Sequence, residues 1–348
     1  MAMVAQRGGQ ASEVWVRASS TAATEVSNVA EKTTSSSLSD AVRAETVREH
    51  LSAYAALSKV RLSALVVLTS AAGYAMAPAA LCTLPHGAAL VATAVGTGLC
   101  AGSANTFNQA IEVKHDAKMN RTKTRVLPTG KLGRGHATGF AVATGAAGVG
   151  LLGLAANPLT AALGAANIAL YAGIYTPLKR VHAVNTWVGA VVGAIPPVMG
   201  YAACMGTIDT TALYLGATLF SWQMPHFMAL AYNLKDDYLR GGYKMMPSFQ
   251  PKRAAAVSLR HAGVMAALAG AAPLMAITTP AFALTAGPVN AYLGYKAYQF
   301  WKHPTHPNAR SLFRVTLWQL PVVLALMLLF KNHGVDDGSE SQQPFHAL

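Results

Sequence analysis

Long apolar stretches recur along almost the whole chain. A transmembrane helix needs about 20 predominantly apolar residues, and nine stretches approximately meet this requirement. Only 12% of the residues are charged, about half the share of an ordinary soluble domain, which argues against a water-soluble fold. The sequence therefore predicts an all-α, polytopic membrane protein with nine transmembrane helices. These helices are expected near residues 62–82, 87–107, 136–156, 159–177, 186–206, 210–231, 254–276, 280–299 and 311–330.

Basic residues gather in alternate connections between the predicted helices. The connections at 83–86, 157–158, 207–209 and 277–279 contain no Lys or Arg. The intervening connections are basic, and basic loops face the cytoplasm, or the matrix in a mitochondrion. The pattern therefore predicts that the N-terminus lies inside and the C-terminus outside. The basic connections contain Lys59 and Arg61, residues 108–135, Lys179 and Arg180, residues 232–253, and residues 302–310.

Both ends of the chain are polar. Residues 1–50 are rich in Ser, Thr and Ala and contain no apolar run, so we expect a disordered or targeting N-terminal extension. Residues 51–331 contain the nine apolar stretches and are expected to form one intramembrane domain. Residues 332–348 are expected to form a polar C-terminal tail.

The first polar cluster follows the second apolar stretch. Asn108, Glu112 and Asp116 are spaced four residues apart, so a helix would place their oxygen atoms along one face. Oxygen ligands of this kind suit Mg²⁺, which proteins usually hold with one or two carboxylates together with substrate phosphates. Arg121 and Arg125 follow at the same spacing, within reach of a phosphate that the metal would bridge.

The second polar cluster directly follows the apolar stretch at 210–231. It contains Asn233, Asp236 and Asp237, and lies on the same predicted side of the membrane as the first. Each cluster alone could be a solvated part of a water-facing basic loop. However, the basic side has no other acidic residue between positions 50 and 331, so we expect one shared metal–phosphate site. The predicted metal ligands are Asn108, Glu112, Asp116, Asn233, Asp236 and Asp237.

Several separated motifs resemble the UbiA-type intramembrane prenyltransferases, over about residues 54–330. Within this family, Gln109 and Glu112 favour the branch that acts on protohaem IX, because members of the quinone pathway tend to carry Asp at these two positions. The motifs are the first cluster from Asn108 to Arg125, Leu57-Ser-Lys59-Val-Arg61, Tyr175-Thr-Pro-Leu-Lys179-Arg180 with Asn185, Gly193-Ala-Ile-Pro-Pro197, Trp222-Gln-Met-Pro225-His226-Phe227, the second cluster, and Ala309-Arg-Ser-Leu-Phe313.

The resemblance implies a UbiA-type helical bundle and a farnesyl transfer. Farnesyl diphosphate would donate its chain to the vinyl group of protohaem IX (haem B), and addition of water would give haem O for terminal oxidase assembly. Mg²⁺ would be the cofactor. The implied catalytic residues are Asn108, Glu112, Asp116, Asp236 and Asp237. The implied substrate-binding residues are Lys59, Arg61, Arg121, Arg125, Tyr175, Lys179, Arg180, Asn185 and His226. For His226 two roles stay open, a haem contact and an interhelical hydrogen bond.

The expected surroundings follow from the same resemblance. The partners would be the two substrates, the lipid bilayer and a haem A synthase that receives the product, with no nucleic acid. We expect a mitochondrial inner membrane protein, or alternatively one of a bacterial plasma membrane, with its active-site loops on the matrix or cytoplasmic side. Two other functions stay open, a prenyltransferase acting on an aromatic quinone precursor and a polytopic anion transporter. A transporter predicts charges along a path across the bilayer, whereas these charges gather at one face.

Overall fold

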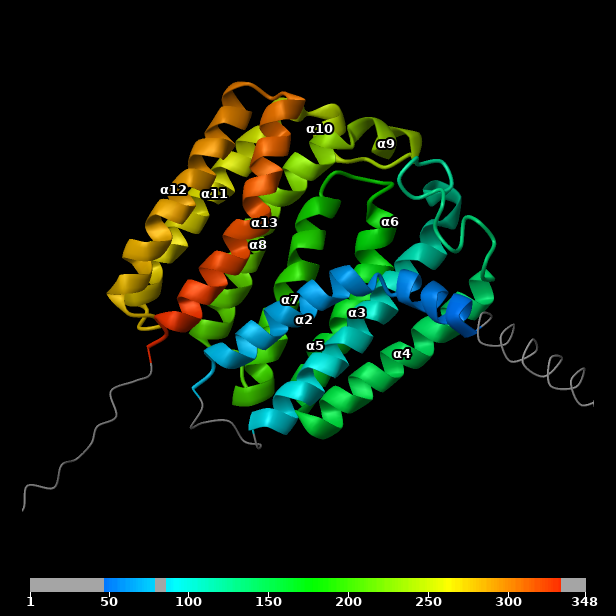
Figure 1. Ribbon diagram of the computed structural model, residues 1–348, viewed down its shortest axis with the longest axis horizontal. Helices are drawn as coiled ribbons and strands as arrows, with labels where there is room; N and C mark the ends of the chain where they lie inside the picture. Colours follow the sequence, from blue (N-terminus) through cyan, green and yellow to red (C-terminus); the bar gives the residue numbers. More distant parts are fainter. Residues whose placement is uncertain (1–46, 79–85, 333–348) are drawn as a thin grey trace, which may run out of the picture. The chain divides into compact units, whose positions relative to one another are not determined.

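The computed structural model describes residues 47–78 and 86–332, whose regular structure is helical (Figure 1). Among these residues, the only β-type pairing is an isolated bridge between Thr278 and Lys331. The predicted all-α fold is therefore confirmed. The chain divides into two units between Ala55 and Ala56, and the described part of the first unit, residues 47–55, is helical. Most of the predicted N-terminal extension and nearly all of the predicted C-terminal tail lie outside the described residues.

The second unit contains the helices that position the site. Each of the nine predicted apolar stretches corresponds to a helical stretch there, with α5, η2 and α6 together forming one of them. The elements are α2 (Val60–Met76), α3 (His86–Asp116), α4 (Arg134–Ala155), α5 (Pro158–Ala169), η2 (Leu170–Tyr175), α6 (Thr176–Leu178), α7 (Asn185–Met205), α8 (Thr210–Asn233), α9 (Lys235–Arg240), α10 (Met246–Phe249), α11 (Pro251–Leu274), α12 (Pro280–Lys302) and α13 (His306–Leu329).

Six of the described helical stretches are long and apolar enough to cross a membrane, or up to seven if Val47–Leu57 and Val60–Met76 form one span. The predicted membrane character is confirmed, but the predicted count of nine spans is not. Helix α2 has only 17 residues. Helices α8 and α12 contain polar side chains such as His226 and Lys296, which lower their mean hydropathy. The six stretches are Gly87–Asp116, Arg134–Ala155, Pro158–Leu178, Asn185–Met205, Pro251–Leu274 and His306–Leu329.

The backbones of helices α2 and α7 are in direct contact where the two helices cross. A Cβ atom on Gly200 would lie 1.7 Å from the carbonyl oxygen of Ser70, and one on Gly73 would lie 2.0 Å from that of Pro197. Only glycine permits so close an approach, which is a common way of packing helices in lipid. The contact fixes α2 against the centre of the bundle, and thereby the position of Lys59 at its N-terminal end.

The polar connections between helices gather at one end of the second unit (Figure 1). The loop after α3, the turn after α6 and the segment containing α9 and α10 meet there. The described chain thus brings the two predicted polar clusters to the same end. In the same region η2 is a π-helical turn, a feature found frequently at functional sites.

Candidate active site

A cavity of about 180 Å³ lies where these connections meet, and we call it the main cavity. Its walls come from the N-terminal end of α2, α3, the loop after α3, η2, and the segment from α9 to α10. The lining combines charged, aromatic and thioether side chains. The lining residues are Lys59, Leu62, Asn108, Glu112, Asp116, Met119, Arg121, Arg125, Tyr171, Tyr175, Lys179, Tyr238, Tyr243 and Met245.

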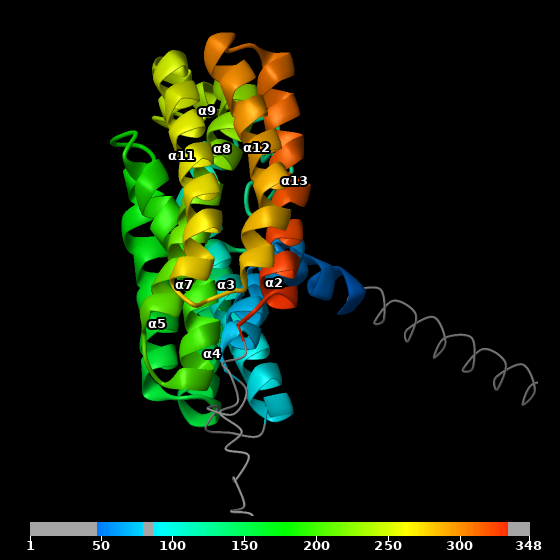
Figure 2. The ribbon, with the colours of Figure 1, turned by 90° about the vertical axis from the view of Figure 1, so that its left-hand side faces the viewer.

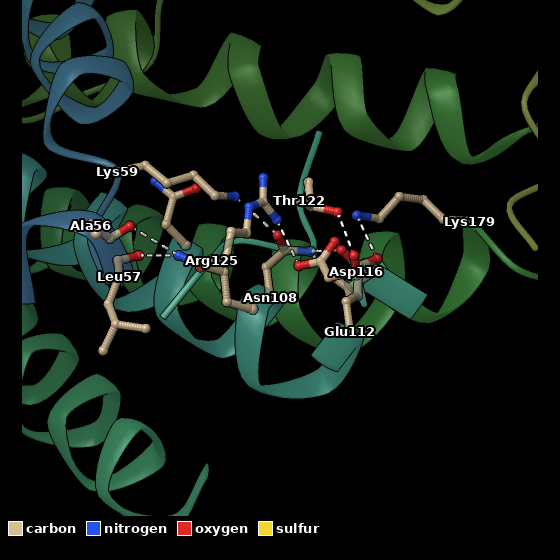
Figure 3. Close-up of polar contacts among 12 residues, drawn as sticks. Ala56, Leu57, Lys59, Asn108, Glu112, Asp116, Thr122, Arg125 and Lys179 are labelled. Carbon is tan, nitrogen blue, oxygen red and sulfur yellow. Dashed lines mark hydrogen bonds and ion pairs between the residues drawn. The ribbon is translucent and has the colours of Figure 1, made fainter. Parts of the chain in front are cut away.

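Asn108, Glu112 and Asp116 all line this cavity from α3, as their spacing predicts. Asn108 Nδ2 donates a hydrogen bond to Glu112 Oε2 at 2.8 Å, and Lys59 Nζ donates to Asn108 Oδ1 at 3.0 Å (Figure 3). All three α3 side chains are buried, with Glu112 and Asp116 each 3% exposed. The alternative of a solvated, water-facing cluster is therefore wrong for Glu112 and Asp116. The loop after α3 folds back and places Arg125 against Asp116, and Lys179 lies against Glu112.

Each buried carboxylate is paired with a cation. Lys179 Nζ lies 2.6 Å from Glu112 Oε1, and Arg125 Nη1 lies 2.7 Å from Asp116 Oδ2 (Figure 3). Lys59 and Arg121 line the same cavity. Four cationic side chains therefore face two carboxylates, and the main cavity has a surplus of positive charge. A surplus of positive charge around a cavity favours a polyanionic ligand.

Lys59 is held in an unusual state. Burial and, to a smaller extent, the nearby cations Arg125 and Lys179 lower its pKa to about 7, against the raising effect of Glu112 and Asp116. Burial also lowers the pKa of Lys179, against the raising effect of Glu112. In addition, Lys59 has a left-handed backbone conformation with φ 46°, which residues other than glycine rarely adopt. An anion bound in the cavity would favour the charged form of both lysines.

Four tyrosines complete the cavity, and only Tyr175 was among the predicted site residues. Tyr171 and Tyr175 come from η2, and Tyr238 and Tyr243 come from the second cluster. Lys179 Nζ lies 4.9 Å from the ring centroid of Tyr175 and 5.5 Å from that of Tyr243. The four-residue spacing of Tyr171 and Tyr175 was a signal that sequence reasoning could have used. These rings help to hold the lysine beside the carboxylate.

A second cavity, of about 350 Å³, adjoins the first, since Arg121 lines both. It contains the predicted residues of the second cluster, which are Asn233, the exposed Asp236 and Asp237. The two clusters therefore lie next to each other, in separate cavities. The lining residues are Asn120, Arg121, Asn233, Leu234, Asp236, Asp237 and Arg240.

Asp237 is occupied by contacts within the protein. Its Oδ1 accepts hydrogen bonds from Asn120 N at 2.8 Å and from Arg240 Nη2 at 2.6 Å, and its Oδ2 accepts one from Arg121 N at 3.3 Å. Burial would raise the pKa of Asp237, but the hydrogen bonds from Arg240 and the two amides outweigh it and hold the pKa below its usual value. The carboxylate therefore fastens the loop after α3 to α9, and so positions Arg121.

The donor atoms fit Mg²⁺ in kind. Asn108, Glu112 and Asp116 offer oxygen atoms along one wall, and Asp236 offers another in the adjoining cavity. Such hard oxygen ligands are those that Mg²⁺ prefers. The described residues contain no group of three or more Asp, Glu, His or Cys side chains placed to hold one ion. The shared six-ligand set therefore stays a prediction.

Four predicted substrate-binding residues lie outside both cavities: Arg61, Arg180, Asn185 and His226. Arg61 is exposed and Arg180 is half-buried, and neither lines a cavity. Asn185 is buried, and its Nδ2 donates to the carbonyl oxygens of His182 and Lys244 at 2.7 and 3.1 Å. Asn185 therefore fastens the start of α7 to the loop before α10.

His226 lies on α8, stacked between aromatic rings. Its ring centroid is 4.6 Å from that of Trp222 and 4.9 Å from that of Phe313. His226 Nδ1 is 2.9 Å from Thr316 Oγ1. The Thr316 hydroxyl donates its proton to the carbonyl oxygen of Phe313 at 2.6 Å. A hydroxyl has one proton to donate, so Nδ1 must be the donor to Thr316, and Nε2 carries the lone pair.

The comparison with known proteins defines the class to which this fold and site belong. The UbiA prenyltransferase family matches residues 66–320, and the chain belongs to this family. Among curated relatives, human "protoheme IX farnesyltransferase, mitochondrial" is 48% identical over 278 residues. The match covers 80% of this chain and 62% of the human protein.

Solved structures show the same fold. A structure of digeranylgeranylglyceryl phosphate synthase superposes with a TM-score of 0.68 at 13% identity, covering 81% of this chain and 98% of that one. A UbiA homolog from Archaeoglobus fulgidus bound to DMAPP and Mg²⁺ superposes with a TM-score of 0.59 at 14% identity, covering 79% and 98%. The predicted UbiA-type bundle is therefore confirmed.

Proposed function

We propose that this chain transfers the farnesyl group of farnesyl diphosphate to the vinyl group of protohaem IX. Addition of water would complete the reaction and give haem O. The similarity to the human relative supports this assignment. Gln109 and Glu112 support it as well, because members of the quinone pathway tend to carry Asp at these two positions. A quinone-precursor prenyltransferase is less well supported for that reason. An anion transporter is disfavoured by the family match.

The observation that carries the proposal is the surplus of cationic side chains that line the main cavity. An allylic diphosphate ionises when the negative charge that develops on its leaving group is stabilised. Lys59, Arg125 and Lys179 face the cavity from three different elements, and Arg121 joins them from the loop after α3. These side chains would bind the diphosphate oxygens and orient the first carbon of the prenyl chain. The apolar lining, Leu62 and Met245 among it, would limit the access of water to the allylic cation.

Mg²⁺ is the proposed cofactor, as in the Archaeoglobus fulgidus structure. When bound, it supplies further neutralisation of the diphosphate charge. Asn108, Glu112 and Asp116 would hold it in the main cavity, and Asp236 with Asn233 would contribute from the adjoining cavity. Because the oxygens of Asp237 are engaged by Arg240 and backbone amides, we assign Asp237 to positioning the loop.

His226 is the proposed haem-side residue, and Thr316 is proposed to fix its orientation. The hydrogen bond from Nδ1 to Thr316 leaves the Nε2 lone pair available to an iron atom. Orienting a ligand histidine through its second nitrogen is a general feature of metal sites. We expect Thr316→Val to weaken haem retention and shift the haem absorption bands. Thr316→Ser, which keeps the hydroxyl, should restore both.

The name of the human relative supports a mitochondrial membrane, and we propose the inner membrane with the polar end toward the matrix. The concentration of basic loops at that end supports this orientation. A haem A synthase is the proposed recipient of the product, as the family resemblance implies.

The proposal is tested by incubating the purified chain with haem B, farnesyl diphosphate and Mg²⁺, followed by mass analysis of the porphyrin. The expected product has gained one farnesyl group and one hydroxyl group, with release of diphosphate and the proton of the added water. The variant Lys179→Met, which removes one cation from the main cavity, should form no product. An unchanged porphyrin, with prenylation of an added aromatic quinone precursor instead, would overturn the assignment in favour of the quinone pathway.

A further inference from the structure

Helices α12 and α13 carry a group of cationic and aromatic side chains on their outward faces. The two helices lie side by side at one edge of the second unit (Figure 2). We call this group of side chains the α12–α13 patch; it consists of Tyr292, Tyr295, Lys296, Gln299, Arg314 and Trp318. Tyr292, Tyr295 and Trp318 are between 42% and 53% exposed. None of these residues lines the main cavity or the second cavity, so the proposed farnesyl transfer does not use them.

The register of the two helices places Lys296 and Arg314 at the same level along the helix pair. The rings of Tyr292 and Trp318 are in contact across the helix pair, with centroids 6.1 Å apart. The helices are antiparallel, and side chains four residues apart share a helix face. Lys296 is one turn beyond Tyr292, and Arg314 is one turn before Trp318, so both lie on the same side of the aromatic pair.

The Lys296 ammonium is held in place by its neighbours. It lies 5.5 Å from the ring centroid of Tyr292 and 5.2 Å from that of Tyr295. It also donates a hydrogen bond to Gln299 Oε1 at 3.2 Å, and Gln299 Nε2 donates to the Tyr295 hydroxyl at 2.7 Å. The ammonium is therefore oriented before any ligand binds.

No carboxylate neutralises the patch. Within the described part of the chain, the salt bridges are Arg125–Asp116, Lys179–Glu112 and Arg240–Asp237, all at the active-site end. The exposed Arg314 and the partly exposed Lys296 thus present two positive charges without an acidic partner. Uncompensated charge on the outer face of a membrane helix is unfavourable. An anionic ligand bound at the patch would neutralise this charge.

The depth of the patch matches the membrane–water interface. Lys296 is six residues from the end of α12, and Arg314 is eight residues from the start of α13. At 1.5 Å per residue these distances are about 9 and 12 Å. Tyr and Trp are enriched at the level of the lipid headgroups, and here they flank both cations. The anion available at this depth is a lipid phosphate.

We propose that the α12–α13 patch is a binding site for an anionic phospholipid. Lys296 and Arg314 contact its phosphate, and the Tyr292–Trp318 pair contacts the glycerol and the upper acyl chains. Basic pockets between membrane helices on the matrix or cytoplasmic side bind such headgroups in general. The site is independent of the farnesyl transfer proposed above.

The test compares lipid retention by native mass spectrometry of the full chain. The protein is purified in detergent and exposed to an equimolar mixture of phosphatidylglycerol and phosphatidylcholine. Wild type is expected to retain phosphatidylglycerol in preference. Lys296→Gln and Arg314→Gln are each expected to reduce this preference about fivefold, and the double variant more strongly. The charge-preserving pair Lys296→Arg and Arg314→Lys should keep most of the preference.

The matched control is Arg260→Gln. Arg260 is an exposed cation nine residues from the start of α11, which places it about 14 Å from that end, at a similar depth. Arg260→Gln should leave the preference unchanged. The proposal is overturned if wild type retains both lipids equally, as a protein-docking patch would, or if Arg260→Gln loses as much preference as the double variant.

Discussion

The Lys179–Glu112 ion pair provides the sharpest test of the main cavity. The two side chains are 10% and 4% exposed, and their charged atoms are 2.6 Å apart. Lys179→Met leaves the Glu112 carboxylate buried, with Asn108 Nδ2 as a remaining donor. Removing one partner of a buried pair costs about 3–5 kcal/mol, because the other charge is left uncompensated. We predict about 3 kcal/mol here, since Lys59 and Arg125 still lie in the cavity.

The double variant Lys179→Met, Glu112→Gln should recover much of that loss. It removes both charges, and replacing a whole buried ion pair is often close to neutral. The two substitutions should therefore be coupled by roughly 2 kcal/mol, well above the error of additive behaviour. Farnesyl transfer should be lost in both variants, because neither has the Lys179 cation that we assign to the diphosphate.

The assay is denaturant unfolding of each full-length variant in one detergent without substrates, with product mass measured in parallel. Arg180→Met is the matched control, since Arg180 is the adjacent cation and lines neither cavity. It should stay near wild type in both measurements. The reasoning fails if Lys179→Met is as stable as Arg180→Met. It also fails if the loss of unfolding free energy in the double variant equals the sum of the losses in Lys179→Met and Glu112→Gln.

Four further predictions follow from the contacts of individual residues. Arg121→Lys should raise the KM for farnesyl diphosphate without changing the haem spectrum, because an ammonium cannot bind two phosphate oxygens as a guanidinium does. Asp116→Ala and Asp236→Ala should both abolish product formation, but only Asp116→Ala should lower the melting temperature, since Asp236 is exposed. Lys59→Gly should be about 1 kcal/mol more stable than Lys59→Ala in unfolding experiments, because of the left-handed backbone, with both variants inactive. The stabilisation by Asp237, whose folded pKa is lowered, is present near neutral pH and should be lost as the pH falls below about 4. Asp237→Asn should flatten that pH dependence of stability.

The arrangement along α3 could be predicted because it depends on local geometry. A four-residue spacing within one helix determines that Asn108, Glu112 and Asp116 share a face, whatever the rest of the chain does. Their burial could not be predicted in the same way. It depends on the loop that follows α3, where Arg125 returns to Asp116 and the fully buried Met119 packs with Tyr238 and Tyr243.

The roles within the second cluster depend on contacts between distant segments. Asp236 and Asp237 are adjacent in sequence, but one is exposed and the other accepts hydrogen bonds from a loop more than a hundred residues earlier. No pattern in residues 232–243 distinguishes the two. The count of nine spans is not confirmed for a related reason, since helices such as α8 and α12 carry polar side chains that lower their mean hydropathy.

The origins of the charges in the main cavity suggest how a substrate would change it. Both carboxylates come from one rigid helix, whereas the cations come from helix ends and a loop: Lys59 before α2, Lys179 after α6, and Arg125 in the loop after α3. Without substrate, Lys179 and Arg125 neutralise Glu112 and Asp116. A diphosphate would compete for these cations, and would thereby release the two carboxylates for a divalent ion. In this arrangement a diphosphate and Mg²⁺ each favour the binding of the other, because each neutralises the charge that the other leaves uncompensated.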